Sequence, residues 1–154
     1  MNIIIAVDSS RSADEVLHEV GERTWSKNTC FYIVTCIESC HNWDAEKQFL
    51  HEGELILNQR ISDLKKRLPD NVITGSVCES GAAEAIFKAA TEHKAHLIIL
   101  GSHGDTGARK QGIGSVAAAV VNQAPCSVEI IKIRQAKPTE NTPKLLTSSQ
   151  KTAH

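Results

Sequence analysis

Apolar and polar residues follow two alternating patterns along this chain. Short apolar runs predict buried strands at 3–7, 30–37, 96–100 and 126–133, and a weaker run that Gly75 interrupts predicts another at 72–78. The segments between them carry apolar residues at helical spacing and predict helices at about 12–26, 45–68, 82–93 and 114–123. Strands that alternate with helices need right-handed crossovers, which place helices on both faces of a sheet. The pattern therefore predicts a small doubly wound α/β domain with a five-stranded, mainly parallel sheet.

Local signals refine the ends of these elements. Ser12 and Glu15 have the spacing of a capping box at the start of the first helix, and Pro69 closes the second helix. In the second helix, the apolar positions that keep approximate helical spacing are Phe49, Leu55, Ile56, Ile61, Leu64 and Leu68. The domain is expected to cover residues 1–134. Residues 135–154 contain two prolines and few large apolar side chains, so we expect a flexible polar tail.

Composition and charge exclude several classes of partner. The 154 residues carry a formal net charge of −1, so the chain lacks the basic surplus that nucleic-acid binding requires. No apolar run approaches the roughly 20 residues that a membrane-spanning helix needs. The N-terminus lacks the basic start and long apolar region of a secretory signal. We therefore expect no nucleic-acid or membrane partner and a cytoplasmic location.

The five cysteines do not indicate a disulfide framework, because their number is odd and no C-x-x-C pair occurs. Four of them lie in or beside apolar strand-like runs, and we expect them to act as small buried hydrophobic residues. Cys36, Cys40 and His41 form the one cluster with metal-ligand chemistry. It has three candidate ligands and lacks the fourth that a structural zinc site needs.

A glycine-rich loop at 101–115 joins the fourth strand to the last helix. Its spacing, G-x2-G-x9-G-S, is formed by Gly101, Gly104, Gly114 and Ser115. Such a loop offers backbone N–H groups and the positive end of a helix dipole to an anion, and glycine allows a close approach of the backbone. The spacing matches neither the G-x-G-x-x-G nor the P-loop fingerprint. We interpret the loop as a candidate phosphate cradle.

Asp8 follows the first strand, so it should lie at the same edge of the sheet as the glycine-rich loop. Ligands of open α/β sheets bind outside the carboxyl ends of the strands, where the strand order reverses. Asp8 could accept hydrogen bonds from a ribose hydroxyl or a base amino group. An alternative stays open at this point: Asp8 only caps the first helix, and the glycines only turn the chain.

The glycine spacing after Ile98-Ile99-Leu100, followed by Ala124-Pro125-Cys126-Ser127-Val128, resembles the universal stress protein family, specifically its ATP-binding branch, over about residues 2–133. The resemblance implies strand order 3-2-1-4-5, bound ATP with Mg²⁺ or Mn²⁺ carried between phosphate oxygens, and a homodimer formed through the last strand, 126–133. It also implies a set of nucleotide-binding positions: Ala6, Val7, Asp8, Cys36, Leu100, Gly101, Gly104, Gly114, Ser115 and Val116. Ala117 departs from the pattern, since some members have a hydroxyl residue there.

Catalysis is not expected from this loop. His103, Arg109 and Lys110 are present, but efficient phosphoryl transfer also needs charge-stabilising groups and a residue that positions the nucleophile. No Walker lysine occurs, and no second carboxylate is clearly placed to hold a metal. We therefore predict an ATP-binding stress-response protein that acts as a dimeric switch toward an unknown protein partner, with no or very slow hydrolysis. The alternative is a dimeric interaction module of the same fold that does not use nucleotide.

Overall fold

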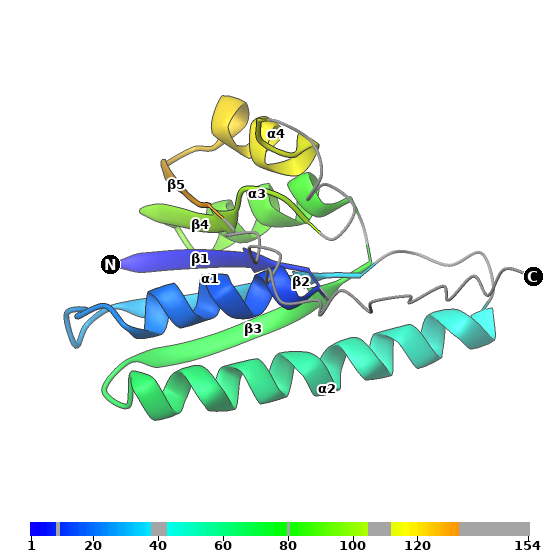
Figure 1. Cartoon of the computed structure of the whole chain (residues 1–154), viewed down its shortest axis with the longest axis horizontal. Helices are drawn as coiled ribbons and strands as arrows, with labels where there is room; N and C mark the ends of the chain where they lie inside the picture. The colour runs from blue at the N-terminus through cyan, green and yellow to red at the C-terminus, as the bar shows by residue number, and fades with distance from the viewer. Residues whose placement is uncertain (9, 38–42, 80, 105–111, 133–154) are drawn as a thin grey trace, which may run out of the picture.

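The computed structural model describes residues 1–8, 10–37, 43–79, 81–104 and 112–132 (Figure 1). The five strands form one parallel sheet with the order β3-β2-β1-β4-β5, which confirms the predicted fold class and strand order. The elements follow one another as β1 (Asn2–Val7), α1 (Arg11–Gly21), β2 (Cys30–Cys36), α2 (Trp43–Arg67), β3 (Val72–Cys78), α3 (Ala82–Glu92), β4 (Leu97–Gly101), α4 (Ser115–Gln123) and β5 (Ser127–Ile131).

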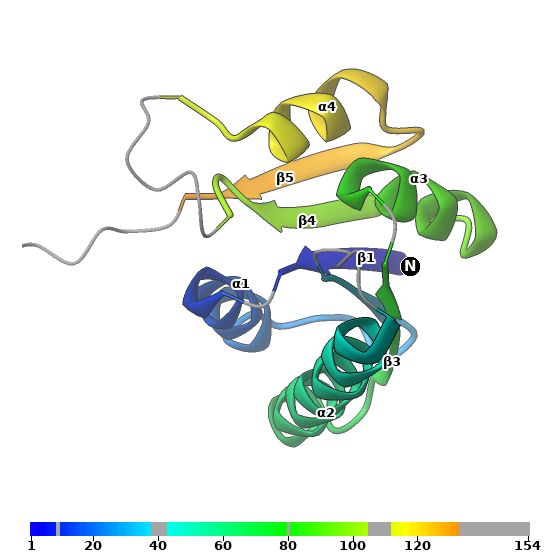
Figure 2. The ribbon, with the colours of Figure 1, turned by 90° about the vertical axis from the view of Figure 1, so that its right-hand side faces the viewer.

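Helices cover both faces of the sheet, as predicted. Figure 2 shows α1 and α2 on one face and α3 and α4 on the other. The first face holds a core cluster that includes Val16, Val20 and Leu64, and the second holds one that includes Ile86 and Val120. Successive residues of the central strand β1 enter the two clusters in turn, because side chains alternate between the faces of a sheet. This explains why β1 is a continuous apolar run.

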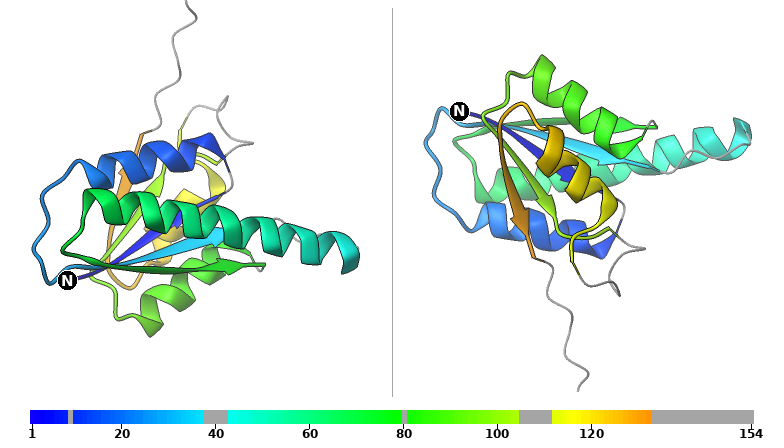
Figure 3. Two further views of the ribbon diagram at one scale, coloured as in Figure 1. Left: turned by 90° about the horizontal axis from the view of Figure 1, so that it is seen from below. Right: turned by 90° about the horizontal axis from the view of Figure 1, so that it is seen from above.

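Helix α2 extends beyond the sheet. Its N-terminal turns project past the edge where the parallel strands end (Figures 1 and 3). The buried positions of α2 are spaced by three or four residues, at Gly53, Leu57, Arg60 and Leu64. The expected apolar stripe was therefore partly wrong: Phe49, Leu55 and Ile56 are 44%, 57% and 37% exposed. These side chains lie on turns beyond the sheet or on faces of α2 turned away from it.

The start and end of α1 also differ from the prediction. Ser10 is the N-cap and the helix ends at Gly21, so Ser12 already lies in the first turn and the capping box is wrong. Beyond the helix, the indole N–H of Trp25 donates to the carbonyl oxygen of Val20 at 2.9 Å, and its ring packs edge-on against Phe31. Packing of this aromatic pair replaces the further helical turn that the sequence suggested.

Three cysteines behave as expected and one does not. Cys36, Cys78 and Cys126 are partly buried against the cluster beneath α3 and α4, whereas Cys30, the first residue of β2, is exposed. These four are free thiols. Cys40 and His41 lie outside the described residues, as do the predicted polar tail, 135–154, and the end of the predicted last strand. Within the described ranges, no helix is both long enough and apolar enough to span a membrane.

Candidate functional site

The loops after β1 and β4 meet at the carboxyl edge of the sheet. A Cβ atom placed on Gly104 would lie 2.7 Å from Oδ2 of Asp8, a distance shorter than real Cβ contacts. Any larger residue at position 104 would therefore displace the Asp8 carboxylate. Because β1 and β4 are neighbours and the strand order reverses at this point, the loops lie where open α/β sheets bind ligands.

Hydrogen bonds within the turn orient the Asp8 carboxylate. Oδ1 accepts the backbone N–H of Ser10 at 2.9 Å and also the Ser10 hydroxyl. Ser10, not Asp8, is the N-cap of α1, and no side-chain cap bond is formed there. Asp8 thus stabilises the turn before the helix instead of capping the first helical N–H groups. With Oδ1 held by Ser10, Oδ2 is the oxygen that faces Gly104.

Arg60 of α2 supports the same turn, and sequence reasoning missed it. Its Nη1 donates to the carbonyl oxygen of Asp8 at 2.6 Å, and its Nη2 donates to that of Ser10 at 3.3 Å. The residue is 8% exposed, and its Nε lies 3.8 Å from a carboxylate oxygen of Asp14. Burial lowers the pKa of Arg60, while the charges of Asp14 and Asp8 oppose this shift. The sequence did contain a sign of this role: Arg60 occurs at the helical spacing of the buried face, between Leu57 and Leu64.

The second half of the site is the N-terminus of α4. Gly114 is its extended N-cap, and the Gly114 N–H donates to the carbonyl oxygen of Ser102 at 2.7 Å. None of the described side chains caps this helix, and Ser115 and Val116 are exposed at its first turn. The N–H groups of a helix's first turn have no partner within the helix, so they can donate to an anion.

His103 lies beside this helix start. Its Cδ2 is 4.0 Å from the Cβ position of Gly114, and its Nδ1 is 3.1 Å from the Ser102 hydroxyl oxygen. Its buried Nε2 has no hydrogen-bond partner within the described part of the chain. A buried polar atom without a partner is costly, so an occupant of the site that bonds to Nε2 would be favoured. Arg109 and Lys110 lie outside the described residues.

The remaining predicted positions lie at the ends of neighbouring strands. Cys36 ends β2 and Gly101 ends β4. Ala6 and Leu100 face the α3 and α4 side, whereas Val7 faces α1 and α2. All three are buried, so contact with a ligand at this edge falls to their main-chain groups.

Cys36 is not an activated thiol. Burial, followed by the charges of Cys78 and Asp8, raises the pKa of Cys36 to about 12. The thiol is therefore protonated at neutral pH, and the thiolate needed for nucleophilic attack or metal ligation is scarce. The described residues contain no group of three or more His, Cys, Asp or Glu side chains that could hold a metal ion.

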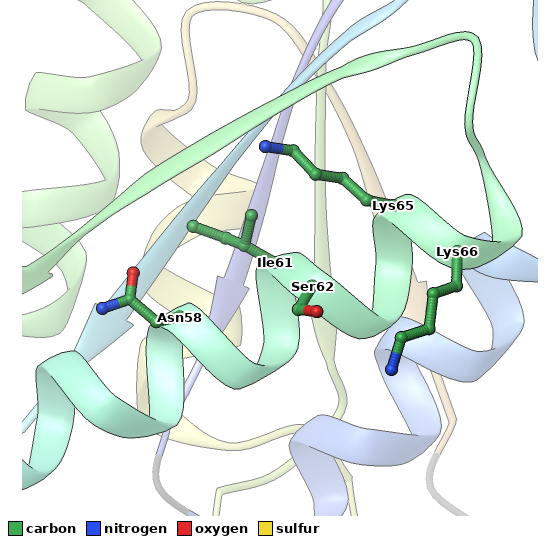
Figure 4. Close-up of a pocket in the computed structure, with 5 residues that line it drawn as sticks. All are labelled: Asn58, Ile61, Ser62, Lys65 and Lys66. Atoms are coloured by element: carbon green, nitrogen blue, oxygen red, sulfur yellow. The ribbon is translucent and has the colours of Figure 1, made fainter.

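Two surface hollows lie away from these residues. One, of about 500 Å³, lies against α2 and is lined by Asn58, Ile61, Ser62, Lys65 and Lys66 (Figure 4). The other, of about 380 Å³, lies between α2 and the edge strand β3 and is lined by residues that include Leu57 and Gly75. The two lysines in Figure 4 point in different directions, so the first hollow does not focus their charges on one ligand. Neither hollow contains a predicted nucleotide-binding residue.

Comparison with known sequences gives a consistent match along the chain. The profile of the universal stress protein family matches residues 1–132. A Staphylococcus aureus protein described as a universal stress protein is 27% identical over 164 aligned positions, which cover 96% of this chain and 92% of the relative.

Solved structures share the fold. A universal stress protein from Lactobacillus plantarum superimposes with a TM-score of 0.69 at 21% identity, covering 85% of this chain and 97% of that chain. The universal stress protein of Archaeoglobus fulgidus in complex with dAMP gives a TM-score of 0.61 at 25% identity, covering 86% and 98% of the two chains.

Proposed function

Because this chain belongs to the universal stress protein family, as the match over residues 1–132 establishes, we propose that it binds an adenine nucleotide, ATP, at the carboxyl edge of its sheet. The observation that carries the proposal is the approach of Asp8 to Gly104 beside the start of α4, which no described side chain caps. A carboxylate and a helix N-terminus suit opposite ends of a nucleotide, since one accepts hydrogen bonds and the other donates them.

In this proposal, different residues of the site bind different parts of the nucleotide. Asp8 accepts hydrogen bonds from the nucleoside, and the main chain at Cys36 contacts the adenine edge, so this contact does not depend on the cysteine side chain. Gly104, Gly114 and the first N–H groups of α4 receive the phosphates. Nε2 of His103 donates to a phosphate oxygen, which supplies the partner that this buried atom lacks among the described residues. The dAMP complex of the Archaeoglobus fulgidus protein supports an adenine nucleotide as the ligand.

The bound nucleotide would regulate the conformation of the protein and would not be hydrolysed at a useful rate. A divalent ion, Mg²⁺ or Mn²⁺, would be held by phosphate oxygens, because the described donor set lacks a group of three ligands for it. Hydrolysis is absent or very slow, since this donor set offers no clear means of positioning an attacking water. ATP would bias the conformation of a homodimer paired through the last strand, 126–133, and a protein partner would recognise that state.

The test is mass spectrometry of the small molecules released when freshly purified protein is denatured. The wild type should release adenine nucleotide near one equivalent per chain, and Gly114→Trp should release little. A side chain at position 114 would meet the Ser102 carbonyl oxygen at 3.4 Å and the His103 backbone at 3.6 Å, and an indole would fill the cradle. Asn122→Trp is the matched control, because it places the same indole on an exposed position of the same helix.

The outcomes separate the two functions. Nucleotide in the wild type and in Asn122→Trp, but not in Gly114→Trp, supports the site, and incubation of the complex then shows whether ADP accumulates. A wild type that is purified empty and also fails to bind added ATP contradicts the proposal. It would favour the interaction module that does not use nucleotide.

A further inference from the structure

Arg60 is a charged side chain at a position where packing alone would favour an apolar one. It occupies the buried face of α2 between Leu57 and Leu64, which both belong to the core cluster, and it is 8% exposed. Removing a guanidinium from water is unfavourable unless its donors are satisfied. The groups that accept hydrogen bonds from its guanidinium should therefore explain why an arginine occupies this position.

Its donors hold the turn that carries Asp8. The two terminal nitrogens donate to two carbonyl groups of that turn, those of Asp8 and Ser10, across 52 and 50 residues of sequence. Ser10 in turn donates its N–H and hydroxyl to the Asp8 carboxylate, and the other carboxylate oxygen faces Gly104. A continuous series of contacts thus runs from α2 to the carboxylate at the candidate nucleotide site.

The guanidinium also changes the charge at this edge. A nucleotide brings several negative charges toward a site that already contains the Asp8 carboxylate. The charge of Arg60 interacts with both Asp8 and Asp14, so it offsets the repulsion that Asp8 alone would exert on phosphate groups. A neutral side chain of similar length would fill the same space without providing this compensation.

We infer that Arg60 is a positioning residue for the nucleotide site. Its hydrogen bonds hold the turn at Asp8 and Ser10 in the conformation that binds the nucleotide, and they connect α2 to that site. This inference rests on the proposed function. Through Arg60, α2, whose N-terminal turns project past the sheet, is in direct contact with the turn at this site (Figure 3).

The experiment compares three variants by calorimetric titration with ATP. Arg60→Met keeps the length of the side chain but removes both hydrogen bonds, so ATP binding should weaken by about tenfold or more. Arg60→Lys keeps the charge and can reach one carbonyl oxygen, so it should recover part of the loss. Arg67→Met is the matched control, because Arg67 joins the same helix to His18 of α1 and to Glu22, the C-cap residue of α1, away from the turn.

The ATP affinities of the three variants distinguish a positioning role of Arg60 from a general contribution to the stability of the fold. Positioning predicts weak binding by Arg60→Met, partial rescue by Arg60→Lys and affinity within about twofold of wild type for Arg67→Met. Equal affinity of wild type and Arg60→Met, or equal losses in Arg60→Met and Arg67→Met, would overturn the inference. If Arg60→Met does not fold, the affinity of Arg60→Lys decides: positioning requires a value below that of wild type.

Hydrogen exchange without nucleotide separates this inference from the proposed function. The Ser10 amide, which donates to Asp8, should exchange faster in the Arg60 variants than in the wild type and in Arg67→Met. If the wild type binds no ATP but this difference is present, the proposed function fails while the support of the turn by Arg60 stands. If ATP binds but Ser10 exchange is unchanged, Arg60 does not hold the turn.

Discussion

Glu129 shows how one side chain can join distant parts of this fold. Arg23, just after α1, donates from Nη1 and Nη2 to the two carboxylate oxygens of Glu129 on β5, at 2.9 and 2.5 Å. This hydrogen bond lowers the pKa of Glu129 and raises that of Arg23. Both side chains are about one-third exposed, so solvent screening limits the contribution to stability.

We expect Glu129→Gln to lower the free energy of unfolding by about 0.5 kcal/mol near neutral pH. The depressed pKa means that the wild-type contribution is present above the ordinary Glu value of 4.5 and is lost as the pH falls through the lower folded value. The variant carries no titrating carboxylate, so its difference from wild type should vanish in acid. Urea unfolding at neutral pH and at about pH 3 measures this. A difference that is equal at both pH values would contradict the assignment.

At the scale of the elements, α2 shows that an apolar residue in a helix is not always a buried one. The helix contains two sets of large apolar residues, of which Leu57 and Leu64 face the core while Phe49 and Leu55 are exposed. Helical periodicity alone admits both sets, because the irregular apolar pattern of this long helix does not define a single face. The observed rotation of α2 turns Gly53 toward Ile37 and Val77, where a Cβ atom would be crowded, and places the Arg60 guanidinium against the turn at Asp8.

This rotation predicts unequal costs for truncating two apolar side chains of α2. Leu64→Ala removes a side chain that is 2% exposed and should lower the free energy of unfolding by about 2–5 kcal/mol. Phe49→Ala changes a side chain that is 44% exposed and should cost about 0.5 kcal/mol. Chemical denaturation of both variants against the wild type tests the difference. Equal costs would mean that α2 is rotated differently against the sheet.

At the scale of the whole molecule, the sheet leaves strands β3 and β5 at its edges within the described residues. Ile131 of β5 accepts a hydrogen bond from Ser102, so its polar groups face the β4 side. Polar groups of successive residues in a strand point to opposite sides, and the N–H groups of Val128 and Ile130 therefore face outward. An edge of this kind is suited to pairing with a second copy of the chain.

If the proposed homodimer forms through this edge, Val128→Pro should convert it to a monomer. Proline removes an outward-facing donor but no bond to β4, so the variant should keep its fold. Light scattering after size exclusion measures the mass, and circular dichroism checks the fold. Val128→Ala is the matched control, because it shortens the same side chain but keeps the outward-facing N–H, and it should stay dimeric. A wild type that is monomeric at every concentration would contradict the dimer itself.

The sequence by itself determined the alternation of elements, the parallel sheet and the two loops of the candidate site. It did so because apolar periodicity records whether a segment is buried on one face or two, and because Asp8 and the glycines end or follow recognisable strands. Apolar periodicity did not predict the end of α1 or the buried face of α2, because these depend on how Trp25 and Arg60 pack against other segments.

Only the tertiary structure decided which residues meet. The approach of Asp8 to Gly104 and the two bonds from Arg60 to the turn join positions separated by 50 or more residues. Such contacts follow from strand register and helix rotation, which are set by packing of the whole domain and leave no local pattern in the chain. For that physical reason Asp8 could be identified from its place after a strand, whereas the residue that holds it in position could not.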